Sequence, residues 1–485
     1  MTGYKIEKET TVSTKVGVFD RIFKIRERGS TVGKEIVGGL ATFMVASYII
    51  FVNPAILSFS GIPDLQGLGV PFGPALAVTC LITSVLTLAY GLWANYPFLI
   101  APGMGLNAVV AFQLILSKGL SWQQAMAVIF LEGLLILILS LTRFRQAIMD
   151  AIPTHLKMAI GVGIGLFILM IGAVDGGLIK MSGVPSAPLT LGDYKSLPVL
   201  ITFIGLVITF GLYVRKVKGA LLLGILLTTG VAIGVNALSG WTAFTTPGVA
   251  VLPAQILSLP DFSSIGAPFA KTNGTIALIS LFAKLGILTT LITVFSIMLS
   301  DFFDTMGTIV GIGAEAGFLD EKGQYPKKGL FRILVIDSLG AMLGGFSGSS
   351  SATTYIESAA GVAEGARTGL ASVVTAILFG AAIFLAPIAG IVPAQAIAPA
   401  LILVGLFMCA GITQVNWRNP VEALPFLVTM IMMPLTYSIT NGIGFGFLTY
   451  VIVKVICGEA RHIHWMMWLA TIAFGLYFAL PALGF

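Results

Sequence analysis

Charged side chains are scarce in this sequence. They make up 10% of its 485 residues, whereas about a quarter of a typical soluble protein is charged. Hydrophobic residues account for 57%, and the mean hydropathy is +0.99. Apolar runs of about 17–25 residues recur, each long enough to cross roughly 30 Å of hydrocarbon. The sequence therefore predicts an all-α polytopic membrane protein. The alternating strands of about ten residues that a transmembrane barrel needs do not occur.

Cysteine and histidine are also rare, with three residues each. The cysteines lie in or beside apolar runs and form no CxxC pair, so we expect neither a disulfide framework nor a metal site. No HExxH, GxSxG or P-loop pattern occurs, so no cofactor is expected and the chain is not predicted to be an enzyme. Gly161, Gly163 and Gly165 lie inside an apolar span with no strand before them, which favours helix packing over nucleotide binding.

The net charge of +6 does not indicate nucleic acid, because the basic residues cluster in short loops, as is typical of cytoplasmic loops. Residues 1–35 hold eight of them, which predicts a cytoplasmic N-terminal segment without a cleaved signal peptide. Arg143, Arg145 and Lys157 are assigned to a cytoplasmic loop after the fourth span.

Two sets of seven apolar spans are predicted. The first set is 36–58, 74–95, 98–117, 122–142, 153–174, 197–214 and 219–236. The second set is 286–312, 329–346, 352–366, 369–389, 397–414, 420–437 and 441–457. Residues 237–275 would connect the sets outside the cytoplasm, and 276–285 would form an interfacial helix. The run 465–483 is a fifteenth span or an interfacial helix. If residues 420–457 form one broken element, the run 465–483 is instead the fourteenth span.

The two sets show traces of a repeat. Aligning FVNP (51–54) with FFDT (302–305) places Asn53 opposite Asp304. Asn107 then follows Asn53 at nearly the spacing at which Glu357 follows Asp304, and both fall in the third span of their set. Because seven is odd, the sets would have opposite orientations in the membrane. This is the inverted-repeat plan of many transporters, whose sites lie between interrupted helices.

Both third spans are interrupted. APGMGLNA (101–108) contains Pro102 and Gly103, so we expect a half-helix from Met104 whose first N–H groups face the centre of the membrane. A plain kink in a structural helix is the alternative. In 347–369, seventeen of 23 residues are Gly, Ala, Ser or Thr. Such backbone is tolerable in a membrane only when it is buried in protein or lines a cavity.

Three acids in these spans are candidate site residues, since an acid facing lipid at a helix centre costs about 2.5–3.5 kcal/mol. Asp301 and Asp304 share a helix face. Asp304 is the better candidate for a ligand or proton carrier, and Asp301 could instead be a structural acid. Glu357 could accept N–H bonds from a purine or pyrimidine. Alternatively, Thr354 and Glu357 form a capping box that satisfies a helix N-terminus.

Other polar residues are weaker candidates. Glu132 and Asp337 are expected to be buried acids that bond helix to helix. Glu364 and Arg367 are expected to pair near a helix end. Phe303 could stack on a heterocycle, although aromatic side chains in membrane helices usually belong to the core.

Four motifs in order resemble those of a known family: FVNPAILS (51–58), APGMGLNA (101–108), SDFFDTMGT (300–308) and SGSSSATTYIESAAGVAEGARTGL (347–370). From about residue 20 to 457, the chain is similar to the AzgA-like purine permeases of the nucleobase–ascorbate transporter superfamily. The resemblance implies a uracil-permease-type fold of 14 transmembrane segments in two inverted seven-segment repeats. Short extended stretches in segments 3 and 10 would be Tyr96–Gly103 and Phe346–Ala352.

The resemblance also divides the chain into parts. They are a core domain (36–142 and 286–389), a gate domain (153–236 and 397–457), an extracytoplasmic connection (237–285) and a C-terminal segment (458–485), interfacial or spanning. Asp304 and Glu357 would contact the base. The other residues implied in or assigned to the pocket are Gly103, Met104, Asn107, Phe303, Ser351 and Thr353. Asp301, Asp304 and Glu357 are the candidates for proton coupling.

The expected function is import of adenine, guanine or hypoxanthine by proton symport, with elevator-like alternating access. An Asp at position 304, where uracil and xanthine carriers have Glu, favours these purines. The expected partners are the base, the proton and the bilayer of the cell inner (plasma) membrane, and a homodimer is left open. An anion transporter or channel of the same architecture is the alternative. An intramembrane aspartyl enzyme is disfavoured because no GxGD motif occurs.

Overall fold

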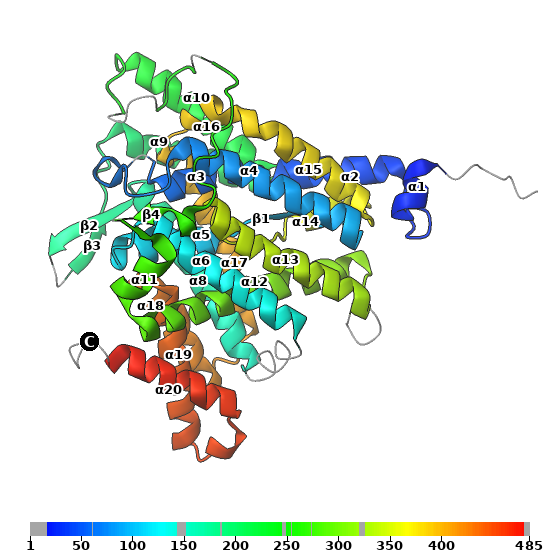
Figure 1. The fold of residues 1–485 in the computed structure, drawn as a ribbon. Coiled ribbons are helices and arrows are strands. Elements are labelled where there is room, and N and C mark those ends of the chain that lie inside the picture. Colours follow the sequence, from blue (N-terminus) through cyan, green and yellow to red (C-terminus); the bar gives the residue numbers. More distant parts are fainter. Residues whose placement is uncertain are drawn as a thin grey trace, which may run out of the picture.

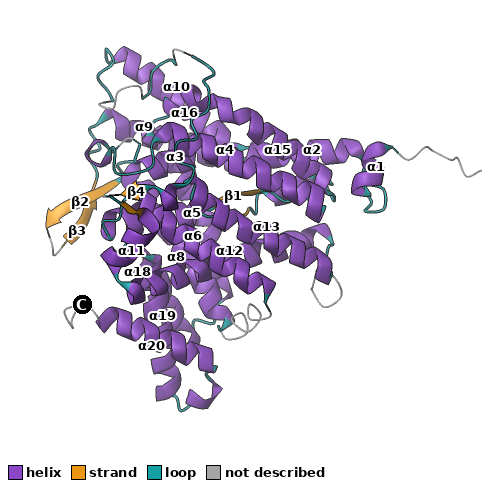
Figure 2. Cartoon of the chain, in the orientation of Figure 1, coloured by secondary structure: helices purple, strands orange, loops and turns teal. Residues whose placement is uncertain are grey.

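The computed structural model describes residues 17–60, 62–142, 152–184, 187–244, 249–253, 255–272, 274–319 and 325–479. These residues are predominantly helical and contain three two-stranded sheets (Figures 1 and 2). Eleven of the described helices are long and apolar enough to cross a membrane, and Met104–Ser117, Pro420–Leu435 and Trp465–Ala479 are shorter apolar helices. The chain is therefore a multi-pass α-helical membrane protein, as its composition predicts.

The helices of the N-terminal half follow the predicted order. They are α1 (Val18–Phe23), α2 (Val32–Ala46), α3 (Ile49–Ser58), α4 (Phe72–Ala89), α5 (Met104–Ala108), α6 (Trp122–Leu141), α8 (Thr154–Asp175), α9 (Leu197–Val214) and α10 (Ala220–Leu238). The predicted half-helix from Met104 is confirmed, and it continues in π-helical turns over Val109–Ser117. Lys157 lies in the first turn of α8, so its assignment to a loop is wrong, while Arg143 and Arg145 lie outside the described residues.

The helices of the C-terminal half are α11 (Ala277–Leu285), α12 (Ile287–Ala316), α13 (Lys327–Ser347), α14 (Ser358–Ala363), α15 (Gly369–Ala382), α16 (Ala386–Gly390), α17 (Ala394–Met408), α18 (Pro420–Leu435), α19 (Ile439–Ile456) and α20 (Trp465–Ala479). The chain turns at Tyr437, whose φ is 48°, and α18 packs along α19. Residues 420–457 are therefore two helices side by side and not one broken span.

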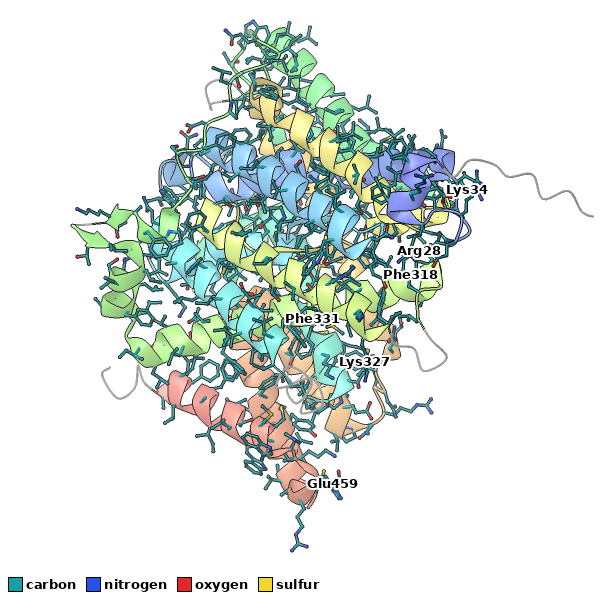
Figure 3. The ribbon with its side chains drawn as sticks, turned by 45° about the vertical axis from the view of Figure 1, so that its right-hand side comes forward. Arg28, Lys34, Phe318, Lys327, Phe331 and Glu459 are labelled. Carbon is teal, nitrogen blue, oxygen red and sulfur yellow. The ribbon has the colours of Figure 1, made fainter. Side chains whose placement is uncertain are left out.

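The C-terminal helix α20 packs against α19 and α12. It slopes in the same sense as α6 and α13 in both ribbon views (Figures 1 and 3).

The strands include one pair that joins the two halves of the chain. β1 (Ile100–Pro102) pairs with β6 (Ala352–Thr354), and two further sheets are β2 (Ile179–Val184) with β3 (Ala187–Leu191) and β4 (Lys271–Thr272) with β5 (Thr275–Ile276). The extended stretch predicted at Phe346–Ala352 is wrong in position, because Phe346 and Ser347 still belong to α13. Gly348 ends α13 with a φ of 90°, and the chain becomes a strand only at Ala352. The β2–β3 pair was not anticipated.

The helices pack in two groups. In the first, α6 lies against α13 and α12, and α15 lies against α4 and α2. In the second, α8 lies against α17 and α18, while α9 lies against α10 and α17. The groups meet where α5 and α12 contact α8 and where α12 contacts α19. In Figure 1, α2, α4 and α15 lie above this meeting zone, and α18 and α19 lie below it.

Within the first group, α6 and α13 approach each other closely. A Cβ added to Gly133 would lie 2.1 Å from the backbone nitrogen of Met342, and one added to Gly345 would lie 2.4 Å from the backbone nitrogen of Phe130. Each helix therefore carries a glycine where the other helix's backbone touches it. No side chain fits at either position without separating the two helices.

Candidate functional site

The centre of the site is the antiparallel pair of β1 and β6. Ile100 faces Thr354, Ala101 faces Thr353 and Pro102 faces Ala352, and all of these residues are buried. The pairing extends beyond the strands, because Gly103 N donates to Ser351 O (2.8 Å) and Tyr355 N donates to Leu99 O (2.9 Å). The hydroxyl of Tyr355 also donates to the carbonyl of Pro102. Two interrupted spans thus meet through their backbones, with α5 beginning at one and α14 just after the other.

Glu357 is the N-cap residue of α14, but its side chain makes no capping hydrogen bond. It accepts instead a hydrogen bond of 2.6 Å from the hydroxyl of Tyr48, the residue before α3. Thr354 lies in β6, and its hydroxyl donates to Asp337 Oδ1 (2.9 Å). The capping-box interpretation is therefore wrong, because strand pairing holds Thr354 away from the start of α14.

Asp304 lies on α12 beside a cavity of about 540 Å³ at the junction of the two helix groups. Three helices and one further residue line the cavity. Helix α12 contributes Ser300, Phe303, Asp304, Gly307 and Thr308, and α8 contributes Lys157, Ile160, Gly161 and Ile164. The end of α17 and the turn after it contribute Phe407, Met408, Ala410, Gly411 and Gln414, and Ile356 lies between β6 and α14. Asp304 is half-buried, and no hydrogen bond or ion pair joins it to another described residue. It is close enough to Glu357 and Asp337 to interact with both electrostatically.

Asp301 faces away from this cavity into the first helix group. It is 1% exposed and accepts a hydrogen bond from the hydroxyl of Ser351 at 3.2 Å. Asp301 and Asp304 therefore point to different surroundings, although both look inward as the sequence predicts. Glu132 of α6 is fully buried beside Asp301, as expected of an acid between helices.

The remaining predicted site residues surround the β1–β6 pair and do not line the cavity. A Cβ on Gly103 would lie 3.2 Å from the hydroxyl of Thr353, so the two strands leave little space there. Met104 and Asn107 of α5 are buried, and both side-chain amide atoms of Asn107 lack a hydrogen-bond partner among the described residues. Of the predicted site residues, Asp304 and Phe303 line the cavity. Glu357 directly follows Ile356, which is also part of the cavity wall.

The predicted pair of Glu364 and Arg367 is wrong. Glu364 forms an ion pair with Lys218, which precedes α10, so this contact joins the two helix groups. Arg367 donates to the carbonyls of Val362 and Ala366 (both 2.7 Å). The spacing of three residues does not suffice here, because α14 ends at Ala363 before Arg367 is reached.

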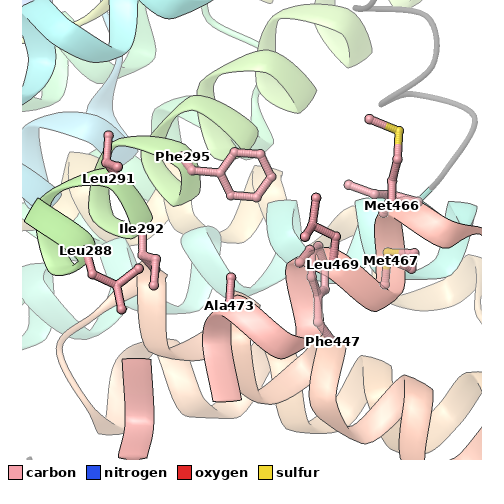
Figure 4. A pocket seen from close by; sticks show the side chains of 11 residues that line it. Leu288, Leu291, Ile292, Phe295, Phe447, Met466, Met467, Leu469 and Ala473 are labelled. Carbon is pink, nitrogen blue, oxygen red and sulfur yellow. The ribbon is translucent and has the colours of Figure 1, made fainter. Parts of the chain in front are cut away.

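A second cavity, of about 320 Å³, lies between α12, α19 and α20 (Figure 4). Its lining includes Leu291, Phe295, Phe447 and Leu469, and all of the lining side chains drawn in the close-up are apolar. A heterocycle with several N–H groups would lose its hydrogen bonds to water there without replacement. The cavity at Asp304, whose wall includes charged and polar side chains, is therefore the candidate functional site.

Several residues of the site were not found from the sequence. Gly163 and Gly165 pack against Met433 and Met408 as predicted, but nothing lies within 4 Å of a Cβ at Gly161, which borders the cavity. Lys157 lies with its ammonium 5.8 Å from the centre of the Phe303 ring. No signal in the sequence could place α8 opposite α12. The hydrogen bond of Tyr48 likewise joins residues 309 positions apart.

A polar cavity between two packed helix groups, next to paired interrupted spans, is the arrangement of a secondary transporter. Residues 33–445 match the family model Xan_ur_permease, described as the Permease family. The chain is 40% identical to the guanine/hypoxanthine permease PbuG of Bacillus subtilis, over 94% of this chain and 98% of that protein. It is 36% identical to the adenine permease AdeP of Escherichia coli, over 94% of each. The chain belongs to the Permease family, and its resemblance to the AzgA-like purine permeases is confirmed.

Solved structures show the same fold at low sequence identity. The transmembrane domain of a cyanobacterial bicarbonate transporter, BicA, matches 84% of this chain and 96% of its own length with a TM-score of 0.57 and 13% identity. At this identity the match describes the architecture alone. The family and the named relatives indicate a transporter and not an enzyme.

Proposed function

We propose that this chain is a secondary active transporter that imports purine nucleobases, namely adenine, guanine or hypoxanthine, together with protons. The observation that carries the proposal is the position of Asp304 in a polar cavity of about 540 Å³ between the helix groups. Cavities of about 300–1,000 Å³ hold small molecules. The names of the relatives PbuG and AdeP support purine bases as the cargo.

The proposed layout has fourteen segments in two inverted sevens. A core domain would comprise 36–142 and 286–389, and a gate domain 153–236 and 397–457. The packing of α6 on α13 and of α8 on α17 supports this division. The antiparallel pairing of β1 with β6 supports a two-fold relation between the third segments. Residues 237–285 would then be the extracytoplasmic connection, and α20 in 458–485 would be an additional spanning helix.

In the proposed complex, Glu357 accepts N–H bonds from the purine and Asp304 accepts another or carries the proton. Phe303, which already borders the cavity, would stack on the ring. Gly103, Met104, Thr353, Ser351 and Asn107 would complete the pocket around β1 and β6. The unpaired amide of Asn107 supports this role, because a buried amide without partners is costly unless a polar ligand can reach it.

We expect Tyr48→Phe to raise the KM for adenine about tenfold with a smaller effect on the maximal rate, since a hydrogen bond to a charged group contributes about 1.5–3 kcal/mol. Without the Tyr48 hydroxyl, Glu357 is no longer held in one orientation. Initial rates of radiolabelled adenine uptake would measure this. Tyr194→Phe is the matched control, because its hydroxyl donates to Leu178 O in an exposed loop. Equal effects of both variants would contradict the role of Tyr48.

Alternating access is proposed to occur by an elevator-like movement of the core domain against the gate domain, along the interface that contains the cavity. The N-terminus would lie in the cytoplasm and the chain in the plasma membrane, with a homodimer left open. Arg28 and Lys34 lie together at the right-hand side of the molecule in Figure 3, which supports a cytoplasmic location of that side by the positive-inside rule.

An anion transporter of the same architecture is the alternative, and Lys157 in the cavity is the feature that favours it. Two acids close to the same cavity oppose it, because they would repel an anion. The test is uptake of radiolabelled adenine into proteoliposomes, in competition with guanine, hypoxanthine, xanthine, uracil and bicarbonate. We expect the first two to compete and bicarbonate to have no effect. Competition by bicarbonate alone would favour the anion transporter.

A further inference from the structure

Two buried acids of the first helix group lie side by side without the partners that buried charges need. Glu132 is in the middle of α6 and Asp301 is in the middle of α12, and they are 0% and 1% exposed. The two helices pack against each other, and the two carboxyl groups are close enough to act on each other directly. No described residue donates a hydrogen bond of normal geometry to either oxygen of Glu132 or to Oδ1 of Asp301. The hydroxyl of Ser351 lies near both acids and donates to Oδ2 of Asp301 at 3.2 Å.

Two ionised carboxylates cannot form a hydrogen bond with each other, because each can only accept. In a buried site they also repel each other strongly. One proton held between them removes a charge, supplies the missing donor and satisfies an unpaired oxygen. Carboxylate pairs that share a proton are a recurring solution to this conflict.

Among the described residues, no basic side chain forms an ion pair with either acid. Lys157 of α8, which packs on α12, borders the cavity, with its ammonium 5.8 Å from the centre of the Phe303 ring. From α13 the pair is faced by Asp337, whose Oδ1 accepts from Thr305 Oγ1 (3.0 Å), Thr354 N (3.0 Å) and Thr354 Oγ1 (2.9 Å). Asp337 therefore has hydrogen-bond donors of its own. On α12 itself, Asp304 is close enough to act on Asp301 electrostatically, although its side chain borders the cavity. Lys284 of α11, which also packs on α6, donates to the carbonyl of Gly119, and the ion pairs between described residues include neither Glu132 nor Asp301.

We propose that Glu132 and Asp301 together form the proton-binding site of the transporter and hold one shared proton. The inference rests on the proposed proton symport, and it adds Glu132 to the candidate coupling residues. It leaves Asp304 and Glu357 as the acids that bind the base. The pair lies wholly within the proposed core domain, so the proton moves with the substrate during the elevator-like step.

The pair is connected to the base site through Ser351. The hydroxyl of Ser351 donates to Asp301, while its carbonyl accepts from Gly103 N at the end of β1. Loss of the shared proton leaves two adjacent anions, which must separate or recruit other donors, and Ser351 is the donor already bound. A change at the pair therefore shifts the segment that joins the two interrupted spans. Proton release and opening of the base site are coupled by this contact.

The test uses the purified full chain in proteoliposomes, with radiolabelled adenine outside and a pH-sensitive dye inside. In the wild-type protein, an inward proton gradient should drive adenine accumulation and adenine entry should acidify the lumen. Glu132→Gln keeps the size of the side chain and can donate to Asp301, but it cannot release a proton. We expect it to lose gradient-driven accumulation and lumenal acidification, while adenine counterflow between loaded vesicles persists and no longer depends on pH.

The controls separate this inference from the proposed function. Glu422→Gln, which changes an acid bonded to Asn419 at the start of α18, should keep gradient-driven accumulation. If Glu132→Gln does not fold, Asp301→Asn should give the same loss, since it also leaves a single titratable acid. Gradient-driven accumulation in either folded variant would overturn the inference, and so would accumulation driven by sodium and not by protons in the wild-type protein. Absence of adenine counterflow in the wild-type protein would instead refute the proposed function.

Discussion

Asp304→Asn is expected to lower the efficiency of adenine transport about 10- to 100-fold, because a hydrogen bond to a charged acceptor contributes about 1.5–3 kcal/mol. Asp304 borders the cavity and has no hydrogen bond or ion pair with another described residue, so a ligand is free to pair with its carboxylate. The substitution keeps the size of the side chain and removes its charge. Initial rates of radiolabelled adenine uptake, normalised to folded protein, measure the effect.

The matched control is Asp261→Asn, in which the acid accepts a hydrogen bond from Ser263 N on the surface of the connection. It should transport adenine at the wild-type rate. The same experiment separates the two candidate cargoes, because removing a negative charge from the cavity should favour an anion. Unchanged adenine uptake in Asp304→Asn would falsify the proposed base contact, and a gain in bicarbonate uptake would support the anion transporter.

Gly345→Val is expected to destabilise the protein by about 3 kcal/mol or more, the upper part of the range for overpacked positions. The new Cβ would lie 2.4 Å from the backbone nitrogen of Phe130, and backbone in the middle of α6 cannot move aside as a flexible side chain can. The helices α6 and α13 would have to separate, and they carry Glu132 and Asp337. Thermal unfolding in detergent and the monodisperse fraction in size-exclusion chromatography measure the loss.

Gly230→Val on α10 controls for the lower helix propensity of valine, since nothing lies within 4 Å of a Cβ at that position. Its melting temperature should remain close to that of the wild-type protein. If Gly345→Val also remained at the wild-type melting temperature, the close approach of α6 and α13 would not be required for stability.

Local sequence patterns predicted much of the site's framework. Pro102 and Gly103 marked the break in the third span, and α5 begins at Met104 as expected. The small residues of 347–369 indicated that this segment is buried in protein, and β6 is fully buried. Two predictions from local spacing were wrong, because in each case the side chain bonds to a residue that is distant in the sequence. Glu357 bonds to Tyr48 and not to its own helix end, and Glu364 pairs with Lys218 and not with Arg367.

The composition and the lengths of the apolar runs were enough to establish a multi-pass membrane protein, and the four motifs were enough to establish its family. These properties are local, because whether an apolar run can span a membrane is set by the length and the residues of that run. The different surroundings of Asp301 and Asp304, by contrast, depend on the tertiary structure. Helical spacing puts both on an inward face, but packing against α6 buries one beside Glu132, while the junction with α8 leaves the other at the cavity. These different surroundings result from contacts between helices that are far apart in the chain, and the sequence of one helix does not predict such contacts.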